Sequence, residues 1–235
     1  MNVVMIHQPH FLPWLGYFNK LLNIDHFIIL DDVQYRPRYY QNRTKILCMS
    51  GAQLWLSVPV STDRNTMIND TKIAKVEWKE KTLETIRYSY GKADYFHESW
   101  KCIQNCLMPD EKSLLSLNIR TLKLILKMLT NKEVSFSLSS SYRIVPKNPT
   151  DRLIKLCKAV GATHYLFGEG NGINYHNPMM FLDNNIKIIQ QSFSRNHPVY
   201  KQQIPGFVPG LSIIDALFNI GSKNTYTLTE KAWKI

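Results

Sequence analysis

The hydrophobic and polar positions of the first forty residues predict a strand, a helix and a second strand. Residues 3–6 form a short apolar run, and its brevity and the prolines that follow favour a buried strand. Apolar side chains then recur at helical spacing between residues 15 and 22, after Pro13, which suits the first turn of a helix. A second apolar run covers 27–30. Two strands joined through one packed helix are expected to lie parallel.

The same reading along the rest of the chain predicts further strands and helices. A hairpin is expected at 44–49 and 54–60, a polar loop at 61–70, strands at 73–76, 134–142, 164–167 and 186–190, and helices at 78–107 with a break near Gly91, 111–129, 152–160 and 212–220. The predicted fold is therefore α/β, a Rossmann-like and mostly parallel sheet with flanking helices and a small hairpin insertion. We expect one domain over 1–235, with a helical subregion at about 78–130.

The last predicted helix carries a local capping pattern. Ser212 stands at the N-cap position and Asp215 follows at the third helical position, which is a carboxylate relative of the capping box. These two side chains are therefore expected to cap the helix.

Charge and composition narrow the class of partner. The chain has 29 Lys and Arg against 18 Asp and Glu, a net charge of +11, which favours an anionic partner. A phosphorylated small substrate, nucleic acid, anionic lipid and a merely solvated basic surface all remain open. The four cysteines are expected to be reduced, with no metal and no cofactor. No run spans a bilayer and no signal peptide is evident, so we expect a cytoplasmic protein.

Polar side chains follow both N-terminal strands. In open α/β sheets, ligands bind outside the carboxyl ends of the strands, and the side chains that fall there are His7, Gln8, His10, Asp31 and Asp32. Either histidine can serve as a general base near neutral pH, although packing explains both equally well. The two aspartates point to opposite faces if both are in the strand, so at most one of them aims into a pocket and the other has an anchoring role. A cap or turn role for the pair stays open.

A glycine-rich turn, GEGNG at 168–172, follows the predicted strand 164–167. It lacks the Lys-Ser/Thr of a P-loop and the spacing of a dinucleotide fingerprint. Both an ordinary tight turn and a loop that contacts substrate fit this sequence.

The opening unit also matches the layout of the HxGH nucleotidyltransferases, in which a strand leads through a proline-containing loop to a helix with two histidines. Here Trp14, Leu15, Gly16 and Tyr17 occupy that place. Aromatic side chains stand where the histidines would be, so cationic phosphate ligands are missing.

Several motifs together resemble the WbqC-like family of bacterial polysaccharide gene clusters. They are HQPHFLPWLGYF, LDDVQY with the following QNR, WLSVPV, YGKADYF, GEGNGINY and HPVYKQQIPGFVPGLSIIDALFNIG, and they run from residue 7 to residue 221. The resemblance implies transfer of glycine to an amino sugar during O-antigen biosynthesis of lipopolysaccharide. Its signature positions here are Gln8, Pro9, Pro13, Gly16, Asn42, Arg43, Gly170, Tyr175, Tyr200, Gln202, Ser212 and Asp215.

Together these points predict an enzyme that transfers an N-acyl group of the aminoacyl type, such as glycyl, to a nucleotide-linked (dTDP-type) amino sugar, with aminoacyl-tRNA or another activated acyl donor. The expected catalytic residues are His7, His10, Asp31 and Asp32, and the expected substrate-binding residues are Gln8, Trp14, Asn42, Arg43, Gly168, Gly170, Tyr175, Tyr200 and Gln202. Arg43 is the candidate for the diphosphate, because its planar fork can hold two phosphate oxygens. Two alternatives stay open: a non-catalytic protein that binds the nucleotide-sugar, and nucleotidyl transfer or adenylation on a degenerate HxGH-type scaffold.

Overall fold

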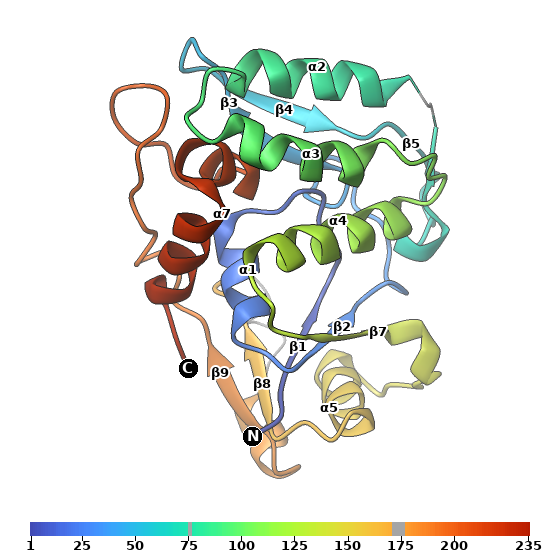
Figure 1. Cartoon of the computed structure of the whole chain (residues 1–235). Coiled ribbons are helices and arrows are strands. Elements are labelled where there is room, and N and C mark those ends of the chain that lie inside the picture. Colours follow the sequence, from blue (N-terminus) through green and yellow to red (C-terminus); the bar gives the residue numbers. More distant parts are fainter. Residues whose placement is uncertain (75–76, 171–176) are drawn as a thin grey trace.

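A five-stranded parallel sheet forms the centre of the chain, in the order β7-β2-β1-β8-β9. The structure, a computed structural model, describes residues 1–74, 77–170 and 177–235. The strands are β1 (Val3–His7), β2 (His26–Ile29), β7 (Ser135–Leu138), β8 (His164–Phe167) and β9 (Lys187–Gln190). The predicted α/β class and Rossmann-like sheet are confirmed (Figure 1).

The order in which strands are added to this sheet reverses next to β1. It passes from β1 to β2 and on to β7 on one side, and then returns to place β8 and β9 on the other side. The carboxyl ends of β1 and β8 therefore flank a topological switch point, which is where open α/β sheets bind ligands.

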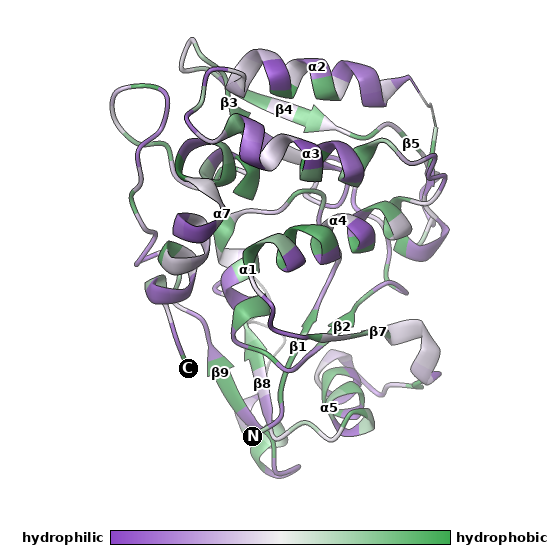
Figure 2. Ribbon diagram, viewed as in Figure 1, coloured by the Kyte–Doolittle hydropathy of each residue, from purple (hydrophilic) through white to green (hydrophobic). Residues whose placement is uncertain are grey.

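Both faces of the sheet are buried, so successive residues of β1 enter different cores. Val3 and Met5 pack into one hydrophobic cluster, and Val4 and Ile6 pack into another. The first cluster takes side chains from α1 (Leu15–Leu22), α4 (Leu114–Leu129) and α7 (Ile213–Ala232), and the second from α5 (Pro149–Ala159) and α6 (Pro178–Leu182). In Figure 2, β2 is largely hydrophobic, whereas α2 (Trp78–Tyr90) at the outside is largely hydrophilic.

A second layer lies above the carboxyl edge of the sheet (Figure 1). Its hairpin pairs β3 (Arg43–Leu47) with β4 (Gln53–Ser57) in antiparallel register, as predicted. The helical subregion contains α2, α3 (Phe96–Leu107) and α4, with the expected break after Tyr90. A short pair, β5 (Val60–Ser61) with β6 (Lys72–Ile73), and the 3₁₀ turn η1 (Ile68–Asp70) add order to the segment predicted as a loop.

Some predicted boundaries were wrong. The strand expected at 134–142 ends at Leu138 and continues as the 3₁₀ turn η2 (Ser139–Tyr142), because the first two serines of this turn bond to Asp31. The last helix runs on to Ala232 across a kink at Gly221, whose φ of 76° suits glycine. Among the described residues, no helix is long and apolar enough to cross a membrane.

Candidate functional site

The candidate site lies where β1 ends and the loop to α1 begins. His7 is the last residue of β1 and pairs in register with Ile29 of β2, so Asp31 follows at the same edge of the sheet. The ring of His7 lies 4.9 Å from that of His10 and 5.0 Å from that of Tyr17, measured between ring centroids. Two histidines and a tyrosine thus form one cluster beside the switch point.

The hydrogen bond of His7 fixes which ring nitrogen carries its proton. Nδ1 lies 2.9 Å from the carbonyl oxygen of Gln8. A carbonyl only accepts, so Nδ1 donates and Nε2 keeps its lone pair. Burial, followed by the positive charge of Lys20 and by His10, lowers the pKa of His7 well below 6.5. His7 is therefore a neutral imidazole at pH 7, with a proton acceptor at Nε2.

His10 is buried and lacks a partner for one ring nitrogen. Its exposed fraction is 7%, and its Nε2 has no hydrogen-bond partner within the described chain. Burial, with the charge of Lys20 second, lowers the pKa of His10 to about 3. A buried polar atom without a partner costs free energy, so the nitrogen of His10 is a candidate contact for a ligand.

Lys20 brings a buried cation to the same place. It belongs to α1 and is 5% exposed, and none of the ion pairs among the described residues includes it. Desolvation lowers the pKa of its ammonium from 10.5 to about 8. A Cβ added at Gly168 would lie 3.3 Å from Lys20 Nζ, so the ammonium reaches the backbone that follows β8. An unpaired cation thus sits at the switch point between β1 and β8.

The loop between β1 and α1 is held in a strained shape. Leu12 has a φ of 42°, a left-handed conformation that costs a leucine of order 1–3 kcal/mol. The hydroxyls of Thr44 and Ser212 both donate to its carbonyl oxygen, at 2.9 and 2.7 Å. Such strain persists where the surroundings enforce it, often at functional sites.

Gln8 is positioned by a second glutamine. Gln41 Nε2 donates to Gln8 Oε1 at 2.8 Å, while Gln41 Oε1 accepts the backbone N–H of Arg36. Because the side-chain oxygen of Gln8 is engaged, its amide NH₂ is oriented as a donor. This NH₂ lies one residue from His7, in a side chain that is only partly buried.

The two aspartates after β2 bind parts of the protein. Asp31 is 1% exposed, and its carboxylate accepts hydrogen bonds from the Ser139 hydroxyl and from the N–H and hydroxyl of Ser140. Asp32 bonds to Ser139 and forms an ion pair with Arg152 of α5. Both side chains therefore hold β2, η2 and α5 together, and their catalytic roles stay predictions.

Asn42 and Arg43 lie at the start of β3. Asn42 donates to the carbonyl of Val58 at 2.9 Å, while its buried Oδ1 has no partner among the described residues. The guanidinium of Arg43 lies 4.0 Å from the ring centroid of Trp55, and its buried Nε also lacks a partner in the described part of the chain. Among the described residues no carboxylate pairs with Arg43. Its charge is available to a ligand.

Tyr200 and Gln202 enter a buried network around Asp215. The Tyr200 hydroxyl donates to Asp215 Oδ2 at 2.8 Å, and the Gln202 amide donates to the same oxygen at 2.9 Å. Tyr90 donates to the other oxygen at 2.9 Å. Desolvation raises the pKa of Asp215 against the effect of these bonds. Substrate binding by Tyr200 and Gln202 stays a prediction, and their polar atoms already have partners here.

The capping interpretation of Ser212 was wrong. Ser212 stands at the N-cap of α7, but its side chain accepts no cap hydrogen bond; instead its hydroxyl donates to the carbonyl of Leu12. Asp215 likewise bonds to the network around it rather than to the start of the helix. Tertiary partners have replaced the local cap.

Trp14 lies among aromatic side chains of the C-terminal loop. Its ring stacks on His197 at a centroid distance of 5.9 Å and meets the edge of Phe193 at 5.3 Å. These contacts hold the loop after β9 against the N-terminal end of α1. A role of Trp14 in binding substrate stays a prediction.

The described part of the glycine-rich turn faces Lys20. Gly168 approaches the Lys20 ammonium, whereas a Cβ at Gly170 would meet none of the described residues within 4 Å. Glu169 accepts a hydrogen bond from the backbone N–H of Ser194 at 2.7 Å, which ties this turn to the loop after β9. The rest of the GEGNG turn and Tyr175 lie outside the described residues.

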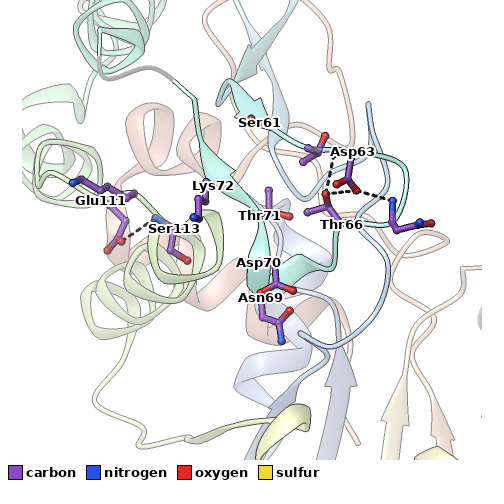
Figure 3. A pocket seen from close by; sticks show the side chains of 12 residues that line it. Ser61, Asp63, Thr66, Asn69, Asp70, Thr71, Lys72, Glu111 and Ser113 are labelled. Atoms are coloured by element: carbon purple, nitrogen blue, oxygen red, sulfur yellow. Dashed lines mark hydrogen bonds between the residues drawn. The ribbon is translucent and has the colours of Figure 1, made fainter.

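A polar cavity of about 950 Å³ lies elsewhere, between η1 and the start of α4. Figure 3 shows its side chains, among them Asp63, Asp70 and Glu111. Asp63 accepts from the N–H of Asn65 and the hydroxyl of Thr66, and Glu111 pairs with Arg120. No predicted site residue that the structure describes lines this cavity. We do not assign the chemistry to it.

Comparison with known proteins identifies the family. The model of the WbqC-like protein family matches residues 8–227. The chain belongs to this family. It is 32% identical over 232 residues to the uncharacterized protein Rv1507c of Mycobacterium tuberculosis, an alignment that covers 95% of this chain and 96% of the relative. No solved structure matches the chain.

In this WbqC-like protein, sequence reasoning missed Lys20. A signal was present, because Lys20 stands among apolar residues in a segment predicted as a packed helix, and every residue of α1 is buried. A lysine at such a position is seldom fully buried unless it is paired. Its approach to Gly168 depends on the return of the chain to β8 and is not visible in the local sequence.

Proposed function

We propose that this WbqC-like protein transfers an acyl group, aminoacyl in type, to the free amine of a nucleotide-linked amino sugar during synthesis of a surface polysaccharide. The observation that carries the proposal is the neutral His7, with its lone pair on Nε2, beside the unpaired Lys20 at the switch point. Acyl transfer to an amine requires a proton acceptor and donors for an oxyanion. An acceptor substrate that carries a diphosphate requires a cation.

The proposed step uses the side chains of two consecutive residues, His7 and Gln8. The sugar amine attacks the acyl carbonyl carbon, and a carbon–nitrogen bond forms. His7 Nε2 takes the proton that the nitrogen loses. The amide NH₂ of Gln8 donates to the oxyanion of the tetrahedral intermediate. When the bond to the leaving oxygen or sulfur breaks, His7 returns the proton to that atom.

Two cations support the binding of the diphosphate. Arg43 offers a planar fork for two phosphate oxygens, and Lys20 offers a buried ammonium whose attraction to an anion is strengthened by its low-dielectric surroundings. A bound phosphate would in turn raise the pKa of His7 and improve it as a base, because an anion favours the protonated imidazole.

Product mass tests the proposal. The protein is incubated with dTDP-linked 4-amino sugars and with glycyl-tRNA, glycine plus ATP, or acyl-CoA, and a mass gain equal to the acyl group is expected with one donor. His7→Gln should lower the rate about 100-fold or more, as expected for loss of a general base. His97→Gln is the matched control, since His97 is exposed on α3. Equal rates for the two variants would refute the role of His7.

The same reactions separate the two alternatives. A non-catalytic binding protein would bind the nucleotide-sugar in calorimetry without any product. Nucleotidyl transfer or adenylation would release pyrophosphate from ATP in the absence of an acyl-accepting sugar. Neither result is compatible with the proposed transfer as the main activity.

A further inference from the structure

Three aromatic side chains extend outward from His10 across the protein surface. Tyr39 and Tyr40 lie with ring centroids 5.7 and 5.8 Å from that of His10, and Trp55 lies 5.8 Å from Tyr40. Their exposed fractions are 42%, 39% and 41%. We call Tyr39, Tyr40 and Trp55 the aromatic platform.

Unpaired cations surround this platform. The guanidinium of Arg43 lies 4.0 Å and the ammonium of Lys45 5.3 Å from the ring centroid of Trp55. Arg36 and Arg38 are exposed in the turn that leads into the tyrosines. No ion pair found among the described residues includes any of these four side chains. The surface is therefore complementary to an anion that carries aromatic groups.

The backbone holds the two tyrosines in place at a cost. Arg38 has a φ of 59°, which is unfavourable for a residue with a Cβ. The strained turn is fastened to the candidate site, because Phe11 N donates to the carbonyl of Tyr40 at 3.0 Å and Arg36 N donates to Gln41, the partner of Gln8. The platform and the loop after β1 thus form one pinned surface.

The surface continues beyond Trp55. A cavity of about 390 Å³ lies between β4 and α2, with Trp55 and Trp78 among its walls and Lys81 as its cation. The path runs from this cavity, across the aromatic platform, to His10, whose Nε2 has no partner among the described residues. It is longer than one nucleobase. A single base would use only one ring.

We propose that the aromatic platform binds a single-stranded RNA segment whose 3′ end reaches His10 and His7. Bases stack on aromatic side chains without regard to sequence, and cations follow the phosphates between them. This inference deepens the proposed function, because it assigns the acyl donor as an ester on the terminal ribose of such a strand. The donor role rests on the proposed function, whereas the binding of RNA by the platform does not. Duplex RNA has its bases covered and offers the platform nothing to stack on.

Fluorescence anisotropy with an unacylated, 5′-labelled RNA hexanucleotide tests the binding. Trp55→Ala and Tyr40→Ala should each weaken it about tenfold, the effect of one lost base stack. Trp100→Ala is the matched control, because Trp100 of α3 also has an arginine over its ring, Arg87 at 5.3 Å. Lys45→Gln should make the salt dependence shallower by about 0.7 in the slope of log K against log salt, and Lys101→Gln should not.

Each outcome decides the question. Binding of the single strand with these losses supports the platform. Equal competition by a blunt duplex, equal molar competition by a mononucleotide, or unchanged binding by folded Trp55→Ala protein would overturn it. RNA binding without any acyl transfer would leave the platform and refute the proposed function. Acyl transfer from acyl-CoA by a protein that binds no RNA would support the proposed function and refute the RNA-binding platform.

Discussion

Replacement of Lys20 by methionine is expected to stabilise the folded protein at neutral pH, by an amount that shrinks as the pH rises. Lys20 is 5% exposed, and burial lowers its pKa from 10.5 to about 8. Below pH 8 the folded protein therefore holds a charged ammonium in an apolar setting, at a cost in free energy. Methionine fills a similar volume without the charge.

The magnitude follows from proton linkage. Between the folded pKa of about 8 and the unfolded value of 10.5, the unfolded chain binds more protons at Lys20, so stability rises with pH across this window. A pKa lowered by this amount reduces the free energy of unfolding by about 3 kcal/mol below pH 8. About 1 kcal/mol of this reduction remains at pH 10. Lys20→Met should therefore increase the free energy of unfolding by about 3 kcal/mol at pH 7 and about 1 kcal/mol at pH 10.

Urea unfolding of both proteins at the two pH values, followed by tryptophan fluorescence, measures this difference. Groups that titrate equally in both proteins cancel. Lys101→Met is the control, because Lys101 is exposed on α3, and its effect should be small and independent of pH. A Lys20→Met protein that is less stable at pH 7, or a difference that stays constant to pH 10, would show that no charged ammonium is buried there. The variant should also lose affinity for phosphate-bearing ligands.

Three further predictions concern the residues around the site. Gly168→Ala should weaken binding of the nucleotide-sugar in calorimetry, because its Cβ would lie 3.3 Å from Lys20 Nζ, and Gly170→Ala, with open space, should not; equal effects would contradict the contact. Asp31→Asn should lower the free energy of unfolding by about 2 kcal/mol, since an amide nitrogen cannot accept the bonds from η2; lost activity at unchanged stability would instead make Asp31 catalytic. Ser212→Ala should cost less than about 1 kcal/mol in urea unfolding, because Thr44 still donates to the carbonyl of Leu12, and a larger loss would show that Thr44 alone does not hold this carbonyl.

The adjacency of the two strand ends that carry the candidate site could be predicted from the sequence, because it depends on short-range patterns. Apolar runs of strand length on both sides of one amphipathic helix are enough to place β1 and β2 side by side, and the register of His7 with Ile29 confirms that their carboxyl ends meet. The reversal of strand order next to β1 follows only from the whole topology. It is this reversal that brings Gly168 to Lys20.

The roles of single polar residues could not be predicted, because their partners come from distant parts of the chain. Asp31 and Asp32 look like paired carboxylates in the sequence, yet Ser139, which is 108 and 107 positions away, bonds to both of them. Asp215 fits a capping pattern, yet it accepts a hydrogen bond from Tyr90, 125 positions earlier. Local patterns give the position of such a side chain in its helix or strand, and long-range packing decides which group it meets.

The acidic side chains near the carboxyl edge of the sheet have partners within the protein, whereas the cations there lack acidic partners among the described residues. This difference favours a ligand-binding role for the cations over a purely structural one. The carboxylates of Asp31 and Asp32 have protein donors, whereas Lys20 and Arg43 have no acidic partner within the described chain. A buried ammonium without an acidic partner, as at Lys20, lowers stability, and an apolar side chain at that position would remove the cost. Lys20 lies at the switch point and Arg43 lies beside Trp55 of the aromatic platform, so the proposed ligand, which carries phosphates and bases, would meet a positive charge at each end. Binding of such a molecule would supply a negative charge to these cations, so the free energy lost by burying Lys20 would be regained as affinity.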